Sequence, residues 1–167
     1  KGGMPAQYGG RLSSVLDIKM NDGNNQDYNV SGGIGLISAK LNVEGPIQKD
    51  KSSFLVTGRR TYVDAFLKLS SDSAINSNRL YFYDLNAKLN YQLGDKDRLY
   101  LSGYFGKDVL GVGETFGIDW GNSTGTLRWN HIFNSQLFAN TSIIFSHYNY
   151  KSSIHSVTDN FDIISKI

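Results

Sequence analysis

The feature that most constrains the fold is a strict alternation of apolar and polar residues in the sequence YDLNAKLNY, residues 83–91. The odd-numbered positions are Tyr, Leu or Ala, and the even-numbered positions are Asp84, Asn86, Lys88 and Asn90. A period of two places successive side chains on opposite faces of a strand. The pattern resumes in LYLSGYFG, residues 99–106, after the turn GDKD. We therefore predict an antiparallel hairpin with one apolar face and one wet face.

The composition extends this prediction to the whole chain, which we expect to be all-β. Among 167 residues there are ten Tyr, nine Phe, two Trp and 18 Gly, but only two Pro. Aromatic residues favour pleated, half-buried surfaces, and glycines favour turns. The best helix candidate is TYVDAFLKL, residues 61–69, which is short and has no convincing cap.

Charge and apolar run length exclude several classes of protein. The 17 basic and 15 acidic residues are mixed along the chain, which argues against a nucleic-acid partner. The absence of cysteine excludes disulfides and thiolate metal sites. No apolar run approaches the roughly 18–20 residues of a membrane-spanning helix, whereas a membrane β-strand needs only about 9–11 alternating residues.

The expected strands are long, and the turns between them alternate in length. We predict strands at residues 12–20, 28–43, 53–62, 80–93, 98–106, 124–133, 136–150 and 161–167. Within residues 28–43 the apolar residues switch from even-numbered to odd-numbered positions, which indicates a bulge or a change in which side of the strand faces the apolar medium. Short turns are expected at residues 44–51, 94–97 and 134–135, and long polar loops at 68–79, 107–122 and 152–160. Long strands with short turns at one rim and long loops at the other are typical of outer-membrane barrels.

We therefore predict a transmembrane antiparallel β-barrel, with residues 1–26 as the end of a preceding plug domain and linker and residues 27–167 as the first barrel strands. Because the strand at residues 12–20 belongs to the plug, about six or seven strands remain for the barrel. These are too few for a closed barrel, so we expect the chain to be an excerpt of a longer protein. A soluble β-sandwich or solenoid with one solvated face gives the same alternation and remains the alternative fold.

Two stretches resemble a known family. PAQYGGRLSSVLDIKM, residues 5–20, and GGIGLISAKLNVEGPIQKDKSSFLVTGRRTY, residues 32–62, look like TonB-dependent outer-membrane receptors of the Bacteroidetes type. The first matches the end of the plug domain, and the second matches the first barrel hairpin. The resemblance implies a barrel of about 22 strands with a plug inside it.

The resemblance also implies function, location and partners. It implies active import of a nutrient through the outer membrane of a Gram-negative bacterium, with no enzymatic activity and no cofactor. The cargo stays open among metal chelates, glycans and peptides. The implied partners are the TonB complex, outer-membrane lipids, and a surface lipoprotein lid or the outer-membrane assembly machinery. A barrel serving as a structural subunit or folding client of an assembly is the alternative function, and a soluble β-rich binding module is a third.

Adjacent arginines supply the main candidate for contact between plug and barrel. Arg59 and Arg60 must point to opposite faces of a strand, because successive side chains alternate. We predict that Arg59 points inward and pairs with a plug carboxylate such as Asp17, near Arg11, while Arg60 lies near the rim. Solvation of both arginines at the rim is the alternative.

The remaining candidate residues are structural. Gly9 and Gly10 are expected to allow a sharp turn at the end of the plug, and Gly45 and Pro46 to form a turn between strands. Asp84, Asn86, Lys88 and Asn90 are expected to face the lumen, where they contact water, plug and neighbouring strands; the alternative is that they line a solute path. The three histidines have no catalytic or metal-ligand spacing, so we predict neither a catalytic nor a metal site.

Overall fold

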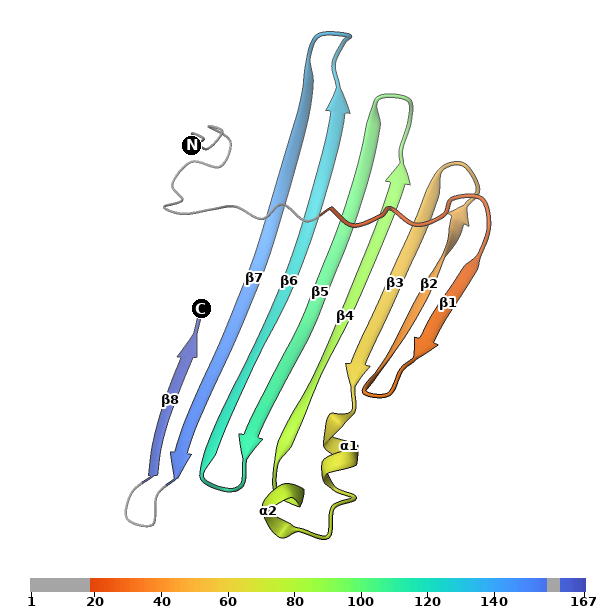
Figure 1. Ribbon diagram of the computed structural model, residues 1–167. Coiled ribbons are helices and arrows are strands. Elements are labelled where there is room, and N and C mark those ends of the chain that lie inside the picture. The colour runs from red at the N-terminus through yellow and green to blue at the C-terminus, as the bar shows by residue number, and fades with distance from the viewer. Residues whose placement is uncertain (1–18, 156–159) are drawn as a thin grey trace, which may run out of the picture.

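The computed structural model describes residues 19–155 and 160–167, and these residues are predominantly β-structure. Strands account for 68% of these described residues and helices for 6%. Eight strands form one antiparallel sheet in which each strand pairs with the next along the sequence (Figure 1). The strands are β1 Asn29–Ile34, β2 Ser38–Gln48, β3 Ser52–Thr61, β4 Arg79–Gln92, β5 Asp97–Val112, β6 Phe116–Ile132, β7 Phe138–His155 and β8 Asn160–Lys166.

Two short helices lie between β3 and β4. Helix α1 spans Val63–Leu67, inside the segment that the sequence predicts to be helical, and α2 spans Ser73–Asn76. The carboxylate of Asp72 caps α2 by accepting a hydrogen bond from the backbone N–H of Ala74. Within the described residues, neither helix has the length or the apolar character needed to cross a bilayer.

The register of the sheet separates the side chains into two faces. Directly opposed residues of neighbouring strands share a face, so β3 Arg59 and β4 Asp84 lie together, as do β4 Leu85 and β5 Phe105. One face, here called the polar face, includes Ser53, Thr57, Arg59, Asp84, Asn86, Lys88, Asn90, Ser102, Thr124, Thr126 and Arg128. The other, here called the apolar face, includes Val56, Leu85, Ala87, Leu89, Leu99, Leu101, Phe105, Leu127, Trp129, Ile143 and Phe145.

The apolar face is exposed, so this sheet has almost no core of its own. Only Leu55 and Val109 are buried hydrophobic residues in the described part of the chain. By contrast, Leu101 is 49% exposed and Ile143 is 68% exposed. The sheet is therefore held by its backbone hydrogen bonds and cross-strand pairs, and its apolar face lacks a covering layer within the described residues.

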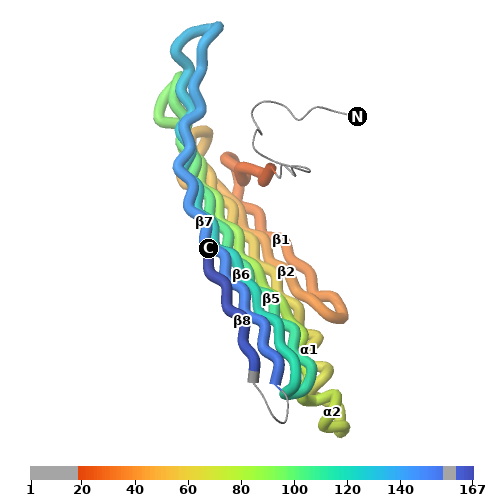
Figure 2. Tube along the Cα trace, turned by 90° about the vertical axis from the view of Figure 1, so that its left-hand side faces the viewer, coloured from red at the N-terminus to blue at the C-terminus, as the bar shows by residue number. Residues whose placement is uncertain are grey.

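Residues 19–27 cross the polar face before the chain enters β1. Figure 1 shows this segment running in front of the strands, and Figure 2 shows it on one side of the sheet. Lys19 and Met20 have no regular structure, although the sequence predicts a strand over residues 12–20. The rest of that predicted strand lies outside the described residues.

The sheet contains eight strands, not the predicted six or seven, in part because the predicted strand 28–43 is a hairpin. The chain turns at residues 35–37, where the N–H of Gly35 donates to the carbonyl of Ser38 over 2.8 Å. The switch of the apolar residues from even-numbered to odd-numbered positions therefore marks this turn. It marks neither a bulge nor a change in which face of one strand meets the apolar surroundings.

The predicted turn at Gly45 and Pro46 is also wrong. Both residues are buried in β2, opposite Phe54 and Ser53. Proline fits there because the pairing register shifts between Pro46 and Gln48, which leaves room for a residue without an N–H. The turn itself comes at residues 49–51, where Asp50 has a φ of 64°.

The predicted long loop at residues 107–122 does not form. β5 continues to Val112 and β6 begins at Phe116, so the connection is a tight turn that includes Gly113 with a φ of 57°. Similarly, β7 runs to His155 and β8 begins at Asn160, which shortens the predicted loop at 152–160. Here the ladder of backbone hydrogen bonds extends strands that the alternation of side chains does not mark.

A polar cluster lies beyond the Tyr91 and Trp129 end of the apolar face, beside the short turns. The carboxylate of Asp97 accepts a hydrogen bond from Trp129 Nε1 at 2.8 Å and contacts His131 Nδ1 at 2.6 Å. These hydrogen bonds, first from His131 and then from Trp129, hold the pKa of Asp97 below its ordinary value.

This lowered pKa predicts a pH dependence of stability at low pH. A carboxyl whose folded-state pKa lies below its unfolded value of 3.8 contributes its full stabilisation above that value. The contribution is lost as the pH falls through the folded-state pKa. We expect Asp97→Asn to lower the urea midpoint of unfolding near neutral pH and to flatten its acid dependence. Asp95→Asn, which removes the same charge from the turn, is the control, and an equal effect in both variants would contradict the prediction.

Candidate functional site

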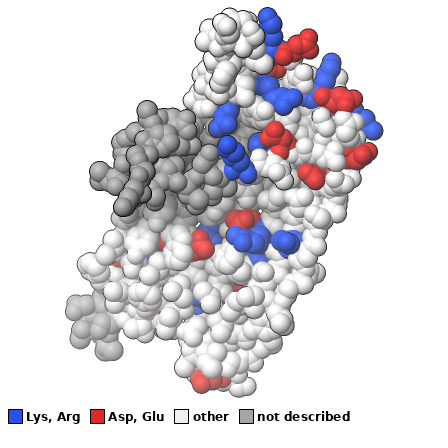
Figure 3. All heavy atoms as spheres, turned by 45° about the horizontal axis from the view of Figure 1, so that its top comes forward, with Lys and Arg blue, Asp and Glu red and all other residues white. Residues whose placement is uncertain are grey.

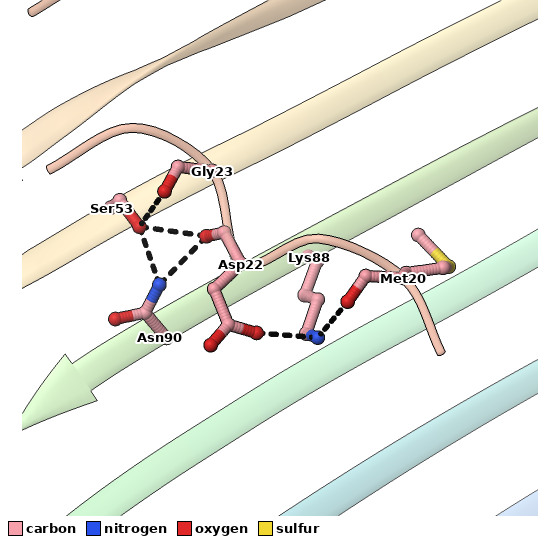
Figure 4. Close-up of polar contacts among 6 residues, drawn as sticks. All are labelled: Met20, Asp22, Gly23, Ser53, Lys88 and Asn90. Atoms are coloured by element: carbon pink, nitrogen blue, oxygen red, sulfur yellow. Dashed lines mark hydrogen bonds and ion pairs between the residues drawn. The ribbon is translucent and has the colours of Figure 1, made fainter. Parts of the chain in front are cut away.

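Three side chains of the polar face hold the segment that precedes β1 (Figure 4). Ser53 Oγ donates to the carbonyl of Asp22 at 2.7 Å, and Asn90 Nδ2 donates to the same carbonyl at 2.7 Å. Lys88 Nζ donates to the carbonyl of Met20 at 2.9 Å and pairs with the Asp22 carboxylate at 2.6 Å. We call this group of contacts the docking site.

The strand register explains why these three side chains converge. Ser53 of β3 lies directly opposite Asn90 of β4, and Asn90 also contacts the Ser53 hydroxyl. Lys88 lies two residues before Asn90 and therefore projects from the same face. Local alternation thus places a hydroxyl, an amide and an ammonium side by side, all of them facing the crossing segment.

The docking site is buried even though the sheet as a whole is exposed. Ser53 is fully buried, and Asn90 is 8% exposed. A buried polar group that loses its partner costs about 1–3 kcal/mol, whereas each satisfied hydrogen bond contributes about 1 kcal/mol. The bound segment therefore stabilises the docking site. Removing the segment without letting water in would leave the buried polar groups of the site unpaired.

Gly23 allows the segment to approach the sheet closely. It has a φ of +84°, which favours glycine, and a Cβ at this position would overlap the carbonyl oxygen of Phe54. Its own carbonyl accepts a longer hydrogen bond from Ser53 Oγ at 3.3 Å. The backbone of Gly23 therefore lies directly against β3.

The following residues connect the docking site to the turn between β2 and β3. Asn24 Oδ1 accepts hydrogen bonds from the N–H groups of Gln26 and Asp27, at 2.8 and 3.1 Å. The N–H of Asp50 donates to the carbonyl of Asn25 at 3.1 Å, and the Gln26 amide contacts the Asp50 carboxylate. This turn of the segment redirects the chain toward the start of β1.

A second polar group lies on the same face, nearer the helices. Arg59 pairs with Asp84 through Nη2 at 2.7 Å and Nε at 2.8 Å, and its guanidinium lies 4.8 Å from the centre of the Phe82 ring. Among the described residues, the carboxylate partner of Arg59 therefore lies on the neighbouring strand β4. The predicted partner Asp17 lies outside the described residues, as do Arg11, Gly9 and Gly10.

Arg60 points to the opposite face, as the alternation predicts. It lies 3.7 Å from the Asp64 carboxylate at the start of α1 and 5.8 Å from the centre of the Tyr81 ring. Each of the two adjacent arginines therefore lies beside an aromatic ring and a carboxylate, but on opposite faces, and Arg59 has the closer contact with both.

The predicted polar row of β4 shares one face, and its members have different partners. Lys88 and Asn90 bind the crossing segment, while Asp84 binds Arg59. Asn86 lies between them, opposite Thr57. Figure 3 shows charged side chains gathered at two levels of the molecule, around the short turns and in a band midway along the strands.

Sequence reasoning missed Ser53, Asp22 and Gly23 as site residues. The run NDGNNQD, residues 21–27, reads as a polar linker, and its docking depends on backbone carbonyls that no side-chain pattern reports. A usable signal was the serine pair at residues 52–53, since small polar residues at a strand start leave room for another backbone.

Comparison of the chain with known proteins adds no identification. No family model matches the chain, no curated protein matches it, and no solved structure matches it. Among the described residues, no group of three His, Cys, Asp or Glu side chains is placed to hold a metal ion. The docking site is therefore the best-defined functional candidate, and its geometry serves to anchor a chain segment.

The docking site predicts a specific cross-link. The chain contains no cysteine, so paired cysteines report only on their own separation. We expect Asp22→Cys with Lys88→Cys to be joined efficiently by a short bis-maleimide reagent. Asp22→Cys with Leu89→Cys is the matched control, because residue 89 is adjacent but lies on the other face. Equal yields from the two pairs, measured by mass spectrometry after digestion, would contradict the docking.

Gly23 provides a second, independent test. We expect Gly23→Ala to reduce the yield of the 22–88 cross-link several-fold, because the added methyl group meets the Phe54 carbonyl and the backbone is strained at positive φ. Gly94→Ala is the control, since a Cβ there has nothing within 4 Å. An unchanged yield in Gly23→Ala would show that the segment does not approach β3 closely.

Proposed function

We propose that this chain contains the plug-to-barrel junction and the first barrel strands of a TonB-dependent importer in a Gram-negative outer membrane. The observation that carries the proposal is the combination of an exposed apolar face with a polar face on which the preceding segment docks. In this proposal the apolar face contacts lipid, the polar face lines the lumen, and residues 19–27 are the last part of the plug linker.

The apolar face has the chemistry expected of a lipid-facing surface. Its large side chains are exposed over many neighbouring strands, including Leu85 at 48%, Phe105 at 46% and Phe145 at 64%. Soluble monomers rarely expose contiguous apolar patches larger than a few hundred Å². Contact with hydrocarbon removes that cost, whereas a soluble binding module would need a covering layer on this face.

Aromatic rings lie at both ends of the apolar face on β4. Tyr91 and Tyr83 are separated by about eight residues, or roughly 27 Å along a strand. For a strand tilted by about 40°, this corresponds to a height of roughly 20 Å, to which the rings themselves add. The total is close to the apolar band of about 25 Å, flanked by aromatic girdles, that outer-membrane barrels present to lipid.

The crossing segment supports a barrel wider than the eight described strands would form alone. An eight-stranded barrel has an interior just wide enough to be filled by its own side chains. Residues 20–23 occupy the polar face as backbone, so a barrel that encloses them needs a larger lumen. Additional strands would also pair the open edges of β1 and β8, whose unpaired backbone groups would each cost several kcal/mol in lipid.

The docking site gives the proposed importer a defined attachment between plug and wall. It consists of a few hydrogen bonds and one ion pair, each of which contributes modestly and can be exchanged for water when the lumen opens. A pulling force transmitted through the plug would act on the Lys88 and Asn90 contacts first. The site can therefore hold the linker in the resting state and release it without unfolding the sheet.

Nutrient uptake with and without TonB tests this function. Cells carrying the full-length protein are compared with deletion cells on limiting metal chelates, glycans and peptides. We expect one class to support uptake that needs both the protein and TonB, with at least about a tenfold loss when either is absent, because active import stops without energy input. TonB-independent uptake, or assembly defects without any uptake defect, would favour the structural-subunit alternative instead.

A further inference from the structure

A row of polar and cationic residues crosses the end of the apolar face, on the side of the tight β5–β6 turn. Successive strand pairings place one residue of each strand from β3 to β8 in the same register. We call this the cationic row, and it consists of Arg60, Tyr83, Lys107, Gly121, Asn149 and Lys166. It contains three cations, one amide, one phenol and no carboxylate.

The cationic row marks a chemical boundary on this face. The adjoining row, toward the middle of the strands, contains the apolar Leu85 and Phe105 on β4 and β5 and the polar Ser123 and His147 on β6 and β7. The apolar residues Leu101, Leu127 and Ile143 lie further along the same face. On the other side of the boundary Asp119 lies opposite Lys151, and Asp162 lies opposite Ser153. Toward the β5–β6 turn, carboxylates and cations therefore mix with the apolar Val109 and Ile164, while the boundary row itself holds only cations among its charges.

Two lysines of the row are available to a ligand. Within residues 19–155 and 160–167, neither Lys107 nor Lys166 forms an ion pair, whereas Lys151 in the next row lies 3.4 Å from the Asp162 carboxylate. Arg60 is the third cation of the row, and its nearest carboxylate oxygen, on Asp64, is 3.7 Å away.

Glycine at the centre of the row creates the space for that ligand. Gly121 lies between Lys107 of β5 and Asn149 of β7 and has no side chain to fill the gap. A groove of about 430 Å³ opens here, lined on this face by Phe105, Lys107, Asp119, Gly121, Ser123, Asn149, Lys151, Ile164 and Lys166, so that its three lysines outnumber its single carboxylate. Its walls offer ammonium and amide donors, and its lining includes an aromatic ring and an isoleucine.

We propose that the cationic row binds the phosphorylated headgroup of a membrane lipid, with the phosphate between Lys107 and Lys166 and the acyl chains along the apolar face. The proposal rests on the proposed function, because it requires the apolar face to meet lipid. Ammonium groups and an amide N–H₂ are suitable donors to phosphate oxygens. The continuous apolar surface next to the row favours a lipid over a free anion, since a free phosphate gains nothing from Phe105 or Ile164.

Lipid titration of the full-length protein in a neutral detergent tests the proposal. The probe is phosphatidic acid, bound lipids are counted by native mass spectrometry, and diacylglycerol with the same chains is the phosphate-free comparison. The test variant combines Lys107→Gln with Lys166→Gln. The matched control combines Lys49→Gln with Lys96→Gln, which removes two lysines from the short turns at the opposite rim.

Each lysine near an anionic lipid surface increases the affinity about five-fold. We therefore expect the row variant, which lacks two lysines, to bind phosphatidic acid about twenty-fold more weakly. The control variant should change less than about twofold, and millimolar inorganic phosphate should not displace the lipid. Equal affinity in the row variant, equal binding of diacylglycerol, or displacement by inorganic phosphate would each overturn the proposal.

Flotation of the protein with vesicles of neutral phosphatidylcholine separates this inference from the proposed function. A protein that floats with neutral vesicles but shows no preference for phosphatidic acid overturns only the headgroup site. A protein that does not float overturns the lipid contact of the apolar face, and the headgroup site with it.

Discussion

The structure depends on antiparallel pairing that keeps its register from β3 to β8 and shifts only at the end of β2 within the described residues. Because directly opposed residues always share a face, a period of two in one strand becomes a property of the whole sheet. A slip of one residue in the pairing of β4 with its neighbours would move the leucines of β4 to the polar face. The register therefore creates, from local alternation, one surface suited to hydrocarbon and one suited to water and to another chain segment.

The docking site and the cationic row follow from the same constraint. On the polar face, alternation brings Ser53, Lys88 and Asn90 together under the segment that enters the sheet. On the apolar face it aligns cations from several strands at one level, between Phe105 and the row that contains Asp119 and Lys151. In the proposed importer these sites have separate roles, since one contacts the plug linker inside the barrel and the other contacts lipid outside it.

The sequence predicts the fold best where a strand has one apolar and one polar face. The hairpin of β4 and β5 and the opposite orientations of Arg59 and Arg60 follow directly from alternation. Prediction fails where alternation stops, as at residues 107–122, because there backbone hydrogen bonds extend strands that have glycines and apolar side chains on both faces, as Val109 and Leu110 show. It fails again at Gly35, where an apolar sequence hides a turn, and at Pro46, where a bulge accommodates the proline within a strand.

The central claim is that hydrocarbon meets one face of the sheet and water meets the other. Single cysteines at residues 84–90 of β4, spin-labelled in the full-length protein in lipid bilayers, test it through their collisions with oxygen and with a water-soluble nickel chelate. The account predicts a period of two, with residues 85, 87 and 89 accessible to oxygen and residues 84 and 86 to the nickel chelate. The half-buried position 88 and the buried position 90, which the crossing segment covers, are less accessible to both. Equal access of the chelate to residues 85, 87 and 89 would contradict it.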